Sequence, residues 1–138
     1  MRLFIDTSAF IARYHSKDRC HKEAMDYTEQ IKTKEAGITE LYTSDYVIDE
    51  MITTIFARTG SFELAKKYGE AIIASKVVNK IWVDQKSFNE SWELFKKQGE
   101  IGLSFTDSTS LILMRKNGIY KIFTFDEHFK KLGLNVVP

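Results

Sequence analysis

Three aspartates stand at the ends of predicted apolar segments or helices. Asp6 follows an apolar run at residues 2–5, and Asp126 follows another near residues 119–125. Asp107 lies in the first turn of a predicted helix that Ser104 or Thr106 can cap. An unpaired carboxylate is costly to bury at such places. Because ligands of parallel sheets bind beyond the carboxyl ends of the strands, we expect the three aspartates to converge there.

Two of the aspartates, Asp107 and Asp126, also have a purely structural explanation. Ser104 and Asp107 are spaced as in a variant capping box, and Asp126 can cap a short helix over residues 127–132. Taken one at a time, the structural and chemical explanations are equally good. The same arrangement occurs at three separate places in the chain, and this repetition favours a shared site.

A cluster of carboxylates predicts a bound cation. Like charges at close range raise one another's pKa, so such a cluster is disfavoured without a bound ion. Mg²⁺ and Mn²⁺ take oxygen ligands, whereas the three histidines are scattered and the single Cys20 excludes a multi-cysteine zinc site. A site of oxygen ligands with one or two such ions indicates phosphoryl chemistry, because the ion lowers the pKa of water and stabilises charge at phosphorus.

Strands and helices alternate along the chain. Strands are predicted at residues 2–5, 38–43, 77–83, 119–125 and 135–137, with helices at 9–14, 18–36, 45–58, 62–75, from Asp84 or Ser87 onward, and from Ser104 or Thr106 to Lys116. This order predicts a three-layer α/β/α sandwich with a short parallel sheet. The helix at 45–58 carries Glu50 and Asp49 at opposite margins of its apolar face, so periodicity alone does not choose between these acids.

Composition indicates an ordinary globular domain. The 138 residues are 43% hydrophobic and 28% charged, and no apolar run reaches the ~18 residues that span a bilayer. The apolar start is too short for a signal peptide, so we expect a cytoplasmic protein without membrane contact. A net charge of +1 gives no global attraction to nucleic acid. Phe88, Trp92 and Phe95 form a helical stripe that is predicted to be core.

Four segments, FIDTSAFIA, SDYVIDEMITTI, LSFTDSTSLILM and IFTFDEHF, resemble the PIN domain family in the same order and over the whole chain. The resemblance implies one PIN-like nuclease domain over residues 1–138. Matched by position, the acidic quartet that holds Mg²⁺ or Mn²⁺ is Asp6, Glu50, Asp107 and Asp126, so the resemblance selects Glu50 over Asp49. It also implies that Thr7 hydrogen-bonds near the metal site and that Thr124 places a hydroxyl beside the last aspartate.

Family members are metal-dependent nucleases, mostly ribonucleases, and many small ones are VapC-type toxins. The resemblance therefore implies an endoribonuclease that hydrolyses RNA phosphodiesters in line, leaving a 5′-phosphate and a 3′-hydroxyl. It also implies a cognate antitoxin and a homodimer. Expected RNA contacts are stacking on Phe10, Tyr14 or Phe105, for which core packing is the alternative, and phosphate contacts from Arg13, Arg115 and Lys116.

Two other functions remain open at this point. A PIN-like module could bind RNA or a protein without cutting, and metal-dependent cleavage of RNA would exclude it. A phosphatase of haloacid-dehalogenase type also uses an aspartate after the first strand. That type requires a second aspartate two residues later, where this chain has Ser8.

Overall fold

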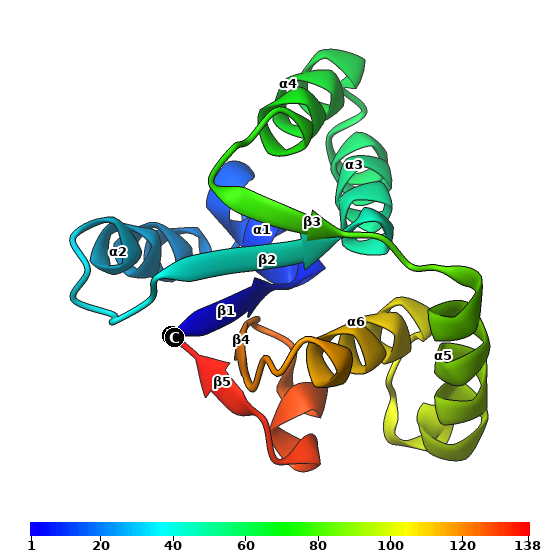
Figure 1. Cartoon of the computed structure of the whole chain (residues 1–138). Coiled ribbons are helices and arrows are strands. Elements are labelled where there is room, and N and C mark those ends of the chain that lie inside the picture. The colour runs from blue at the N-terminus through cyan, green and yellow to red at the C-terminus, as the bar shows by residue number, and fades with distance from the viewer.

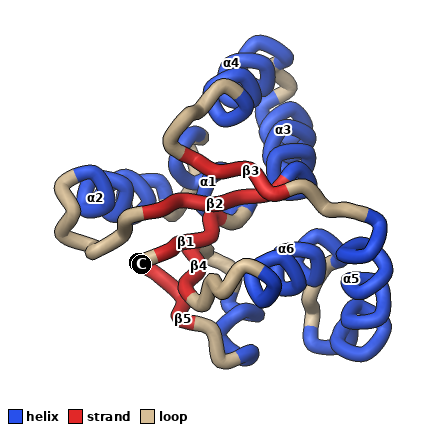
Figure 2. Tube along the Cα trace, viewed as in Figure 1, coloured by secondary structure: helices blue, strands red, loops and turns tan.

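The computed structural model describes residues 1–98 and 100–138 and contains a five-stranded parallel sheet (Figures 1 and 2). The strands are β1 (Arg2–Ile5), β2 (Glu40–Ser44), β3 (Val78–Ile81), β4 (Lys121–Phe123) and β5 (Asn135–Val137). Their spatial order is β3-β2-β1-β4-β5, and every pairing is parallel. The predicted α/β fold with five short parallel strands is therefore confirmed.

Six α-helices connect the strands: α1 (Thr7–Tyr14), α2 (His21–Lys32), α3 (Asp45–Thr59), α4 (Phe62–Ile73), α5 (Gln85–Gln98) and α6 (Phe105–Lys116). Two short 3₁₀-helices, η1 (Gly99–Ile101) and η2 (Glu127–Leu132), precede α6 and β5. Because crossovers between parallel strands are right-handed, this strand order places α1–α4 on one face of the sheet and α5 and α6 on the other. The result is the three-layer sandwich (Figure 1).

The second helix is shorter than predicted. The sequence pattern favours residues 18–36, but α2 begins at His21 and ends at Lys32. The Asp18 carboxylate instead accepts a hydrogen bond from the Cys20 backbone N–H at 2.8 Å, which fixes a turn before the helix. At the other end, Lys34 and Gly37 both adopt φ of 67°, a left-handed conformation that stops a helix.

The aromatic stripe of α5 differs from its prediction as core. Trp92 is 48% exposed and Phe88 is 42% exposed. The helix packs on α6, and its stripe lies at the margin of that contact and not beneath it. In the described residues, no helix is both long and apolar enough to cross a membrane.

The central strand β1 positions the residues that follow it. Leu3 and Phe4 are fully buried, and the Asp6 backbone N–H donates to the Phe123 carbonyl of β4 at 3.0 Å. On the other side, the Thr43 hydroxyl of β2 donates to the Ile5 carbonyl at 2.9 Å. The carboxyl end of β1 is thus held between two neighbouring strands, and Asp6 emerges from the middle of that edge.

Candidate active site

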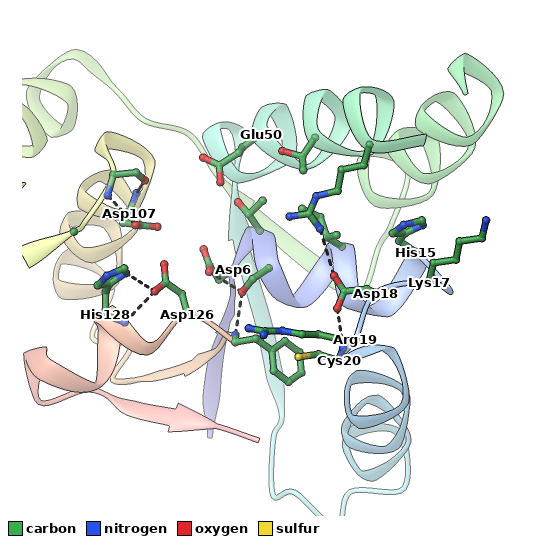
Figure 3. A pocket seen from close by; sticks show the side chains of 18 residues that line it. Asp6, His15, Lys17, Asp18, Arg19, Cys20, Glu50, Asp107, Asp126 and His128 are labelled. Atoms are coloured by element: carbon green, nitrogen blue, oxygen red, sulfur yellow. Dashed lines mark hydrogen bonds and ion pairs between the residues drawn. The ribbon is translucent and has the colours of Figure 1, made fainter. Parts of the chain in front are cut away.

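One pocket at the carboxyl edge of the sheet is lined by all four predicted acids (Figure 3). Asp6 follows β1, Glu50 lies in α3, Asp107 lies in the first turn of α6, and Asp126 follows β4. Figure 3 shows the other three arranged around Asp6. Asp49, the alternative to Glu50, is exposed on α3 and does not line the pocket. The structure thus brings together four segments that lie far apart in the sequence.

Asp6 has one carboxylate oxygen that is fully bonded and one that is not. Its side chain is only 3% exposed. The Oδ2 atom accepts hydrogen bonds from the Thr124 hydroxyl at 2.7 Å and from the Ser8 hydroxyl at 3.2 Å. The Oδ1 atom is buried and has no hydrogen-bond partner among the described residues. A buried oxygen without a partner is costly, so this atom has the capacity to accept a ligand such as a cation.

The electrostatics of Asp6 favour its neutral form in the metal-free protein. Burial is the largest cause, and together with the charges of Asp107 and Glu50 it raises the pKa of Asp6 to about 7. The hydrogen bond from Thr124 acts in the opposite direction but is outweighed. Such a carboxyl ionises fully near neutral pH only if a positive charge compensates it.

Asp107 completes the start of α6 and lines the pocket at the same time. The Ser104 hydroxyl accepts from the Asp107 backbone N–H at 3.1 Å, and Asp107 Oδ2 accepts from the Ser104 N–H at 2.9 Å. This is the predicted capping box. Burial raises the pKa of Asp107 to about 6; the Ser104 hydrogen bonds oppose this shift, and the charges of Asp126 and Glu50 add to it. Asp107 is therefore both a helix-capping residue and a carboxylate that lines the pocket.

Asp126 is engaged by His128 (Figure 3). Its Oδ1 accepts from the His128 backbone N–H at 2.9 Å and caps η2. His128 Nδ1 lies 2.6 Å from the same oxygen, in a close contact and not an aligned hydrogen bond. Gly102, with φ of +93°, packs against this ring so tightly that a Cβ there would lie 2.4 Å from Nε2. The sequence analysis did not single out His128; its position two residues after Asp126 was the available signal.

A hydroxyl pair at the pocket connects the start of α1 to the residue that follows β4. The Ser8 and Thr124 hydroxyls lie 3.0 Å apart. Ser8 accepts from the Phe125 N–H at 2.9 Å, and Thr124 accepts from the Asp126 N–H at 3.0 Å. The hydroxyl predicted at Thr124 is therefore beside Asp126, but the hydrogen-bonding role assigned to Thr7 is filled by Ser8. Thr7 lines the pocket, and its buried hydroxyl has no hydrogen-bond partner among the described residues.

The donor set fits a hard divalent cation, although the side chains do not yet form a ligand cage. Within residues 1–98 and 100–138, no three acidic, histidine or cysteine side chains are arranged closely enough to hold a metal ion. Like charges repel in the metal-free state, and Asp107 and Asp126 are each held by a backbone N–H. Four carboxylates around the unpartnered Asp6 Oδ1 supply the oxygen ligands that Mg²⁺ or Mn²⁺ prefers, provided that the side chains turn inward.

The predicted RNA contacts do not reach the pocket. Phe10 is buried in the core, and together with Arg13 and Tyr14 it lines a separate pocket on the α2 and α4 side. The helical period explains this result: Thr7, Ile11 and His15 repeat every four residues along the pocket side of α1, which turns the three predicted residues to the opposite side.

The basic pair at the end of α6 also lies elsewhere. Lys116 Nζ donates to the Ser87 hydroxyl at 2.9 Å and pairs with Glu90 at 3.3 Å, so it connects α6 to α5. Arg115 is exposed and does not line the pocket. The first turn of α6 contacts the pocket, and its last turn points away from it.

Three other basic residues line the pocket at the end opposite to the acids, namely Lys17, Arg19 and Arg58. Figure 3 shows Lys17 and Arg19 on the far side of Asp6 from Asp107. Arg58 Nη1 lies 3.4 Å from Asp18 Oδ2. This basic end was not predicted from the sequence. Arg58 follows Glu50 by two turns of α3, and this spacing was the signal that could have identified it.

Comparisons with known proteins agree with this arrangement. The family model of the PIN domain matches residues 3–134. The 23S rRNA-specific endonuclease VapC20 of Mycobacterium tuberculosis is 30% identical over 131 residues, which cover 95% of this chain and 94% of VapC20. A VapC ribonuclease of Archaeoglobus fulgidus is 26% identical over 94% of this chain and 80% of that protein.

Solved structures show the same fold. The crystal structure of M. tuberculosis VapC20, described as a sarcin-ricin loop cleaving toxin, superposes with a TM-score of 0.82 over 99% of both chains. VapBC2 from Rickettsia felis, at 14% identity and a TM-score of 0.67, covers 99% of this chain and 98% of its own and shares the fold. The motifs at the strand ends, the pocket that they form and the match over nearly the whole length lead to one conclusion: the chain belongs to the PIN domain family.

Proposed function

We propose that this protein is a Mg²⁺- or Mn²⁺-dependent endoribonuclease, the toxin of a VapBC-type toxin–antitoxin pair, formed by a single PIN domain over residues 1–138. The likeness to VapC20, at 30% identity over almost the full length of both chains, supports the reaction and the substrate class. The acidic pocket supports the dependence on a divalent cation.

The observation that carries the proposal is the asymmetry of Asp6. One oxygen is held by Thr124 and Ser8, and the other is buried without a partner between acids from three other elements. A structural carboxylate would be bonded at both oxygens. The Oδ1 atom of Asp6 is unpaired, and the charges of Asp107 and Glu50 disfavour the ionised form of this carboxyl. We therefore infer that Oδ1 is a ligand atom for a cation.

In the proposed site, Asp6, Glu50, Asp107 and Asp126 hold the cation. A bound divalent ion activates water and stabilises the charge that develops at the attacked phosphorus. The role of Ser8 and Thr124 is to orient Asp6, because their hydrogen bonds hold Oδ2 and leave Oδ1 unbonded. The Ser104 N–H restrains Asp107 in the same way.

We further propose that the protein acts in the cytoplasm, binds a cognate antitoxin and forms a homodimer. Support for self-association comes from large apolar side chains exposed on α3 and α4. Phe56 is 50% exposed, Phe62 63% and Ile73 58%, and they line one shallow groove. Exposed apolar surface of this kind commonly marks a protein interface. Light scattering at micromolar concentration should give the mass of a dimer, and a monomer would contradict this part of the proposal.

A cleavage assay on single-stranded RNA tests the function. Cleavage should require Mg²⁺ or Mn²⁺ and stop with excess EDTA. The sharpest comparison within the chain is Glu50→Gln with Asp49→Asn, since the two acids are neighbours on α3 but only Glu50 lines the pocket. Glu50→Gln should abolish cleavage, whereas Asp49→Asn should leave it unchanged. Equal activity of the two variants, or undiminished cleavage in chelator, would contradict the proposed site.

A further inference from the structure

Beside the acidic pocket lies a cluster of five aromatic rings that the proposed chemistry does not use. This ring cluster consists of Tyr46, Phe88, Trp92, Phe95 and Phe105. Phe105 is its centre: the centroids of the other four rings lie 5.2–6.3 Å from that of Phe105, each in an edge-to-face arrangement. Contacts of this geometry fix the orientation of the outer rings.

The two outermost rings of the cluster are open to solvent. Trp92 is 48% exposed and Phe88 is 42% exposed, one turn apart on α5. Phe95 stacks on Trp92, with ring centroids 5.8 Å apart and an interplanar angle of 22°. The indole is therefore supported by Phe95 and Phe105 while about half of its surface remains accessible. Two large aromatic side chains that pack on other rings and are still exposed are unusual if their only role is packing.

The ring cluster adjoins the acidic pocket on two elements. Tyr46 lies one helical turn before Glu50 in α3, and Phe105 lies between the pocket residue Ser104 and Asp107 at the start of α6. The path from an acid to an exposed ring is short, because Trp92 is in direct contact with Phe105. The ring cluster therefore extends from the edge of the pocket at Phe105 to the exposed rings of α5.

Two lysines near Trp92 can attract a polyanion, but one of them is already paired with a glutamate. Lys96 Nζ lies 5.9 Å from the centroid of the indole, and it also pairs with Glu93 at 2.8 Å. Lys97 is exposed and forms no ion pair with any described residue. The cations can contact phosphates on either side of a stacked base, but the apolar rings supply the larger contact.

We propose that Phe88 and Trp92 form a stacking platform for unpaired bases of the RNA whose phosphodiester lies at the acidic pocket. The proposal rests on the ribonuclease function above and extends it to recognition of single-stranded substrate. Every base has a π-face, so stacking on aromatic side chains binds single strands without a fixed sequence. A protein partner is the competing occupant. The continuity of the rings with the acidic pocket through Phe105, together with the lysine beside the indole, favours RNA.

Binding measured without cleavage tests the platform. The probe is a fluorescent single-stranded oligoadenylate of about ten nucleotides, in excess chelator, beside a strand of equal length with abasic sites. Trp92→Leu keeps an apolar side chain on Phe105 but removes the flat face, and Trp92→Phe restores one. The matched control is Tyr120→Leu, since Tyr120 is 72% exposed and lies before β4, at the opposite edge of the sheet. Melting curves establish that each variant is folded.

Trp92→Leu should weaken binding of the intact strand by about 5- to 100-fold, the range expected for one lost stacking contact, whereas Trp92→Phe should stay within about 3-fold. Binding of the abasic strand should change little. The slope of log affinity against log salt should not change, because no phosphate contact is removed. An equal loss on both strands would show a backbone contact, and no loss on either would assign the rings to packing or to a protein partner. Both results would overturn the platform.

Cleavage in Mn²⁺ separates the two proposals. If the parent protein cleaves RNA and Trp92→Leu matches Tyr120→Leu in KM, the platform fails and the nuclease stands. If the parent protein binds RNA through Trp92 but does not cleave it in Mn²⁺, the nuclease fails and the platform stands. The expected result is a raised KM for Trp92→Leu with kcat within about 2-fold of the parent, since stacking away from the reacting atoms contributes uniform binding.

Discussion

The two ends of the active-site pocket are built in different ways. At the acidic end, Asp6 and Asp107 are 3% and 7% exposed, and hydrogen bonds from backbone or buried hydroxyls hold them. At the basic end, Arg58 has a half-exposed side chain whose only ion pair in the described structure is with Asp18 at 3.4 Å. Figure 3 shows the two ends on opposite sides of Asp6.

This difference indicates that the acidic end can support chemistry and that the basic end can support binding. A reaction needs ligand atoms held within a fraction of an ångström, and buried strand ends provide such positions. Long exposed side chains cannot hold that precision, but they can attract and retain a polyanion through charge alone. Substitutions at the acidic end should therefore change the rate of the reaction, and those at the basic end should change affinity and its dependence on salt.

The largest effect is expected for Asp107→Asn, which keeps the helix cap and removes one charge. Asn also serves at helix starts, so unfolding of the metal-free protein should require as much free energy as in the parent or more, because repulsion is relieved. Cleavage should fall by more than about 100-fold. The increase in melting temperature on adding Mn²⁺ should shrink, because a ligand stabilises in proportion to its binding. A variant that keeps both cleavage and the full Mn²⁺ response would leave Asp107 as a helix cap only.

A second test uses the pH dependence that Asp6 imposes on metal-free protein. Its pKa is raised from 3.8 to about 7 in the folded state, so the unfolded chain releases this proton first. The stability that the neutral carboxyl contributes is therefore complete below about pH 4 and is lost as the pH rises to about 7, by at most ~1.4 kcal/mol per pH unit.

The Asp6→Asn variant should not show this loss of stability as the pH rises, because it has no carboxyl at this position. Denaturant unfolding in EDTA at pH 4 to 8 measures the free energy of unfolding of both proteins. The free energy of the variant should exceed that of the parent by an amount that grows with pH. A difference that stays constant over this range would contradict the charge argument at the acidic end. Added Mn²⁺ should reverse the trend in the parent, since the cation binds the ionised carboxylate.

A smaller effect is expected for Ser8→Ala, which removes a hydroxyl that orients Asp6 without touching the cation. Loss of its hydrogen bonds should cost about 1 kcal/mol of stability and reduce cleavage by about 10-fold. The matched control is Thr7→Ser, which keeps a hydroxyl at the neighbouring position, where the structure shows no hydrogen bond within the described residues. A higher Mn²⁺ concentration should restore part of the Ser8→Ala activity, whereas a defect unrelated to the metal site would not respond.

The smallest effect is expected at the basic end. Arg58→Gln should weaken RNA binding a few-fold, lower the salt slope by about one unit and leave kcat nearly unchanged. Arg115→Gln is the control, because Arg115 is exposed on the last turn of α6, away from the pocket. Titrations at several salt concentrations distinguish the two. An equal slope for Arg58→Gln and the parent would remove Arg58 from the RNA-binding surface.

The contrast between the acidic and the basic end of the pocket also explains which site residues could be predicted from the sequence. Asp6 and Asp126 follow apolar strands, and the topology of a parallel sheet brings strand ends together whatever the details of packing. Glu50 could be chosen over Asp49 only through the family resemblance, because both flank the apolar face of α3. At the basic end, the spacing from Glu50 could have identified Arg58, but Lys17 and Arg19 lie in a turn, where no helical or strand period predicts which way a side chain points.

The aromatic stripe of α5 shows a second limit. Its spacing indicates one face of a helix, and apolar faces are normally buried. Whether a facing element covers that stripe depends on how α5 sits on α6, a tertiary property that periodicity does not contain. Trp92 and Phe88 therefore appear as core in the sequence and as surface in the structure.

The bond between Thr124 and Asp6 joins residues 118 positions apart and has a consequence for biosynthesis. Asp6 is made well before its orienting hydroxyl, the strand β4 beside it and Asp126. A nascent chain that has not yet reached Thr124 and Asp126 has no neighbour for one side of β1 and no closed acidic pocket. For a nuclease whose proposed substrate is RNA, catalytic competence therefore arises only after β4 and Asp126 have emerged from the ribosome.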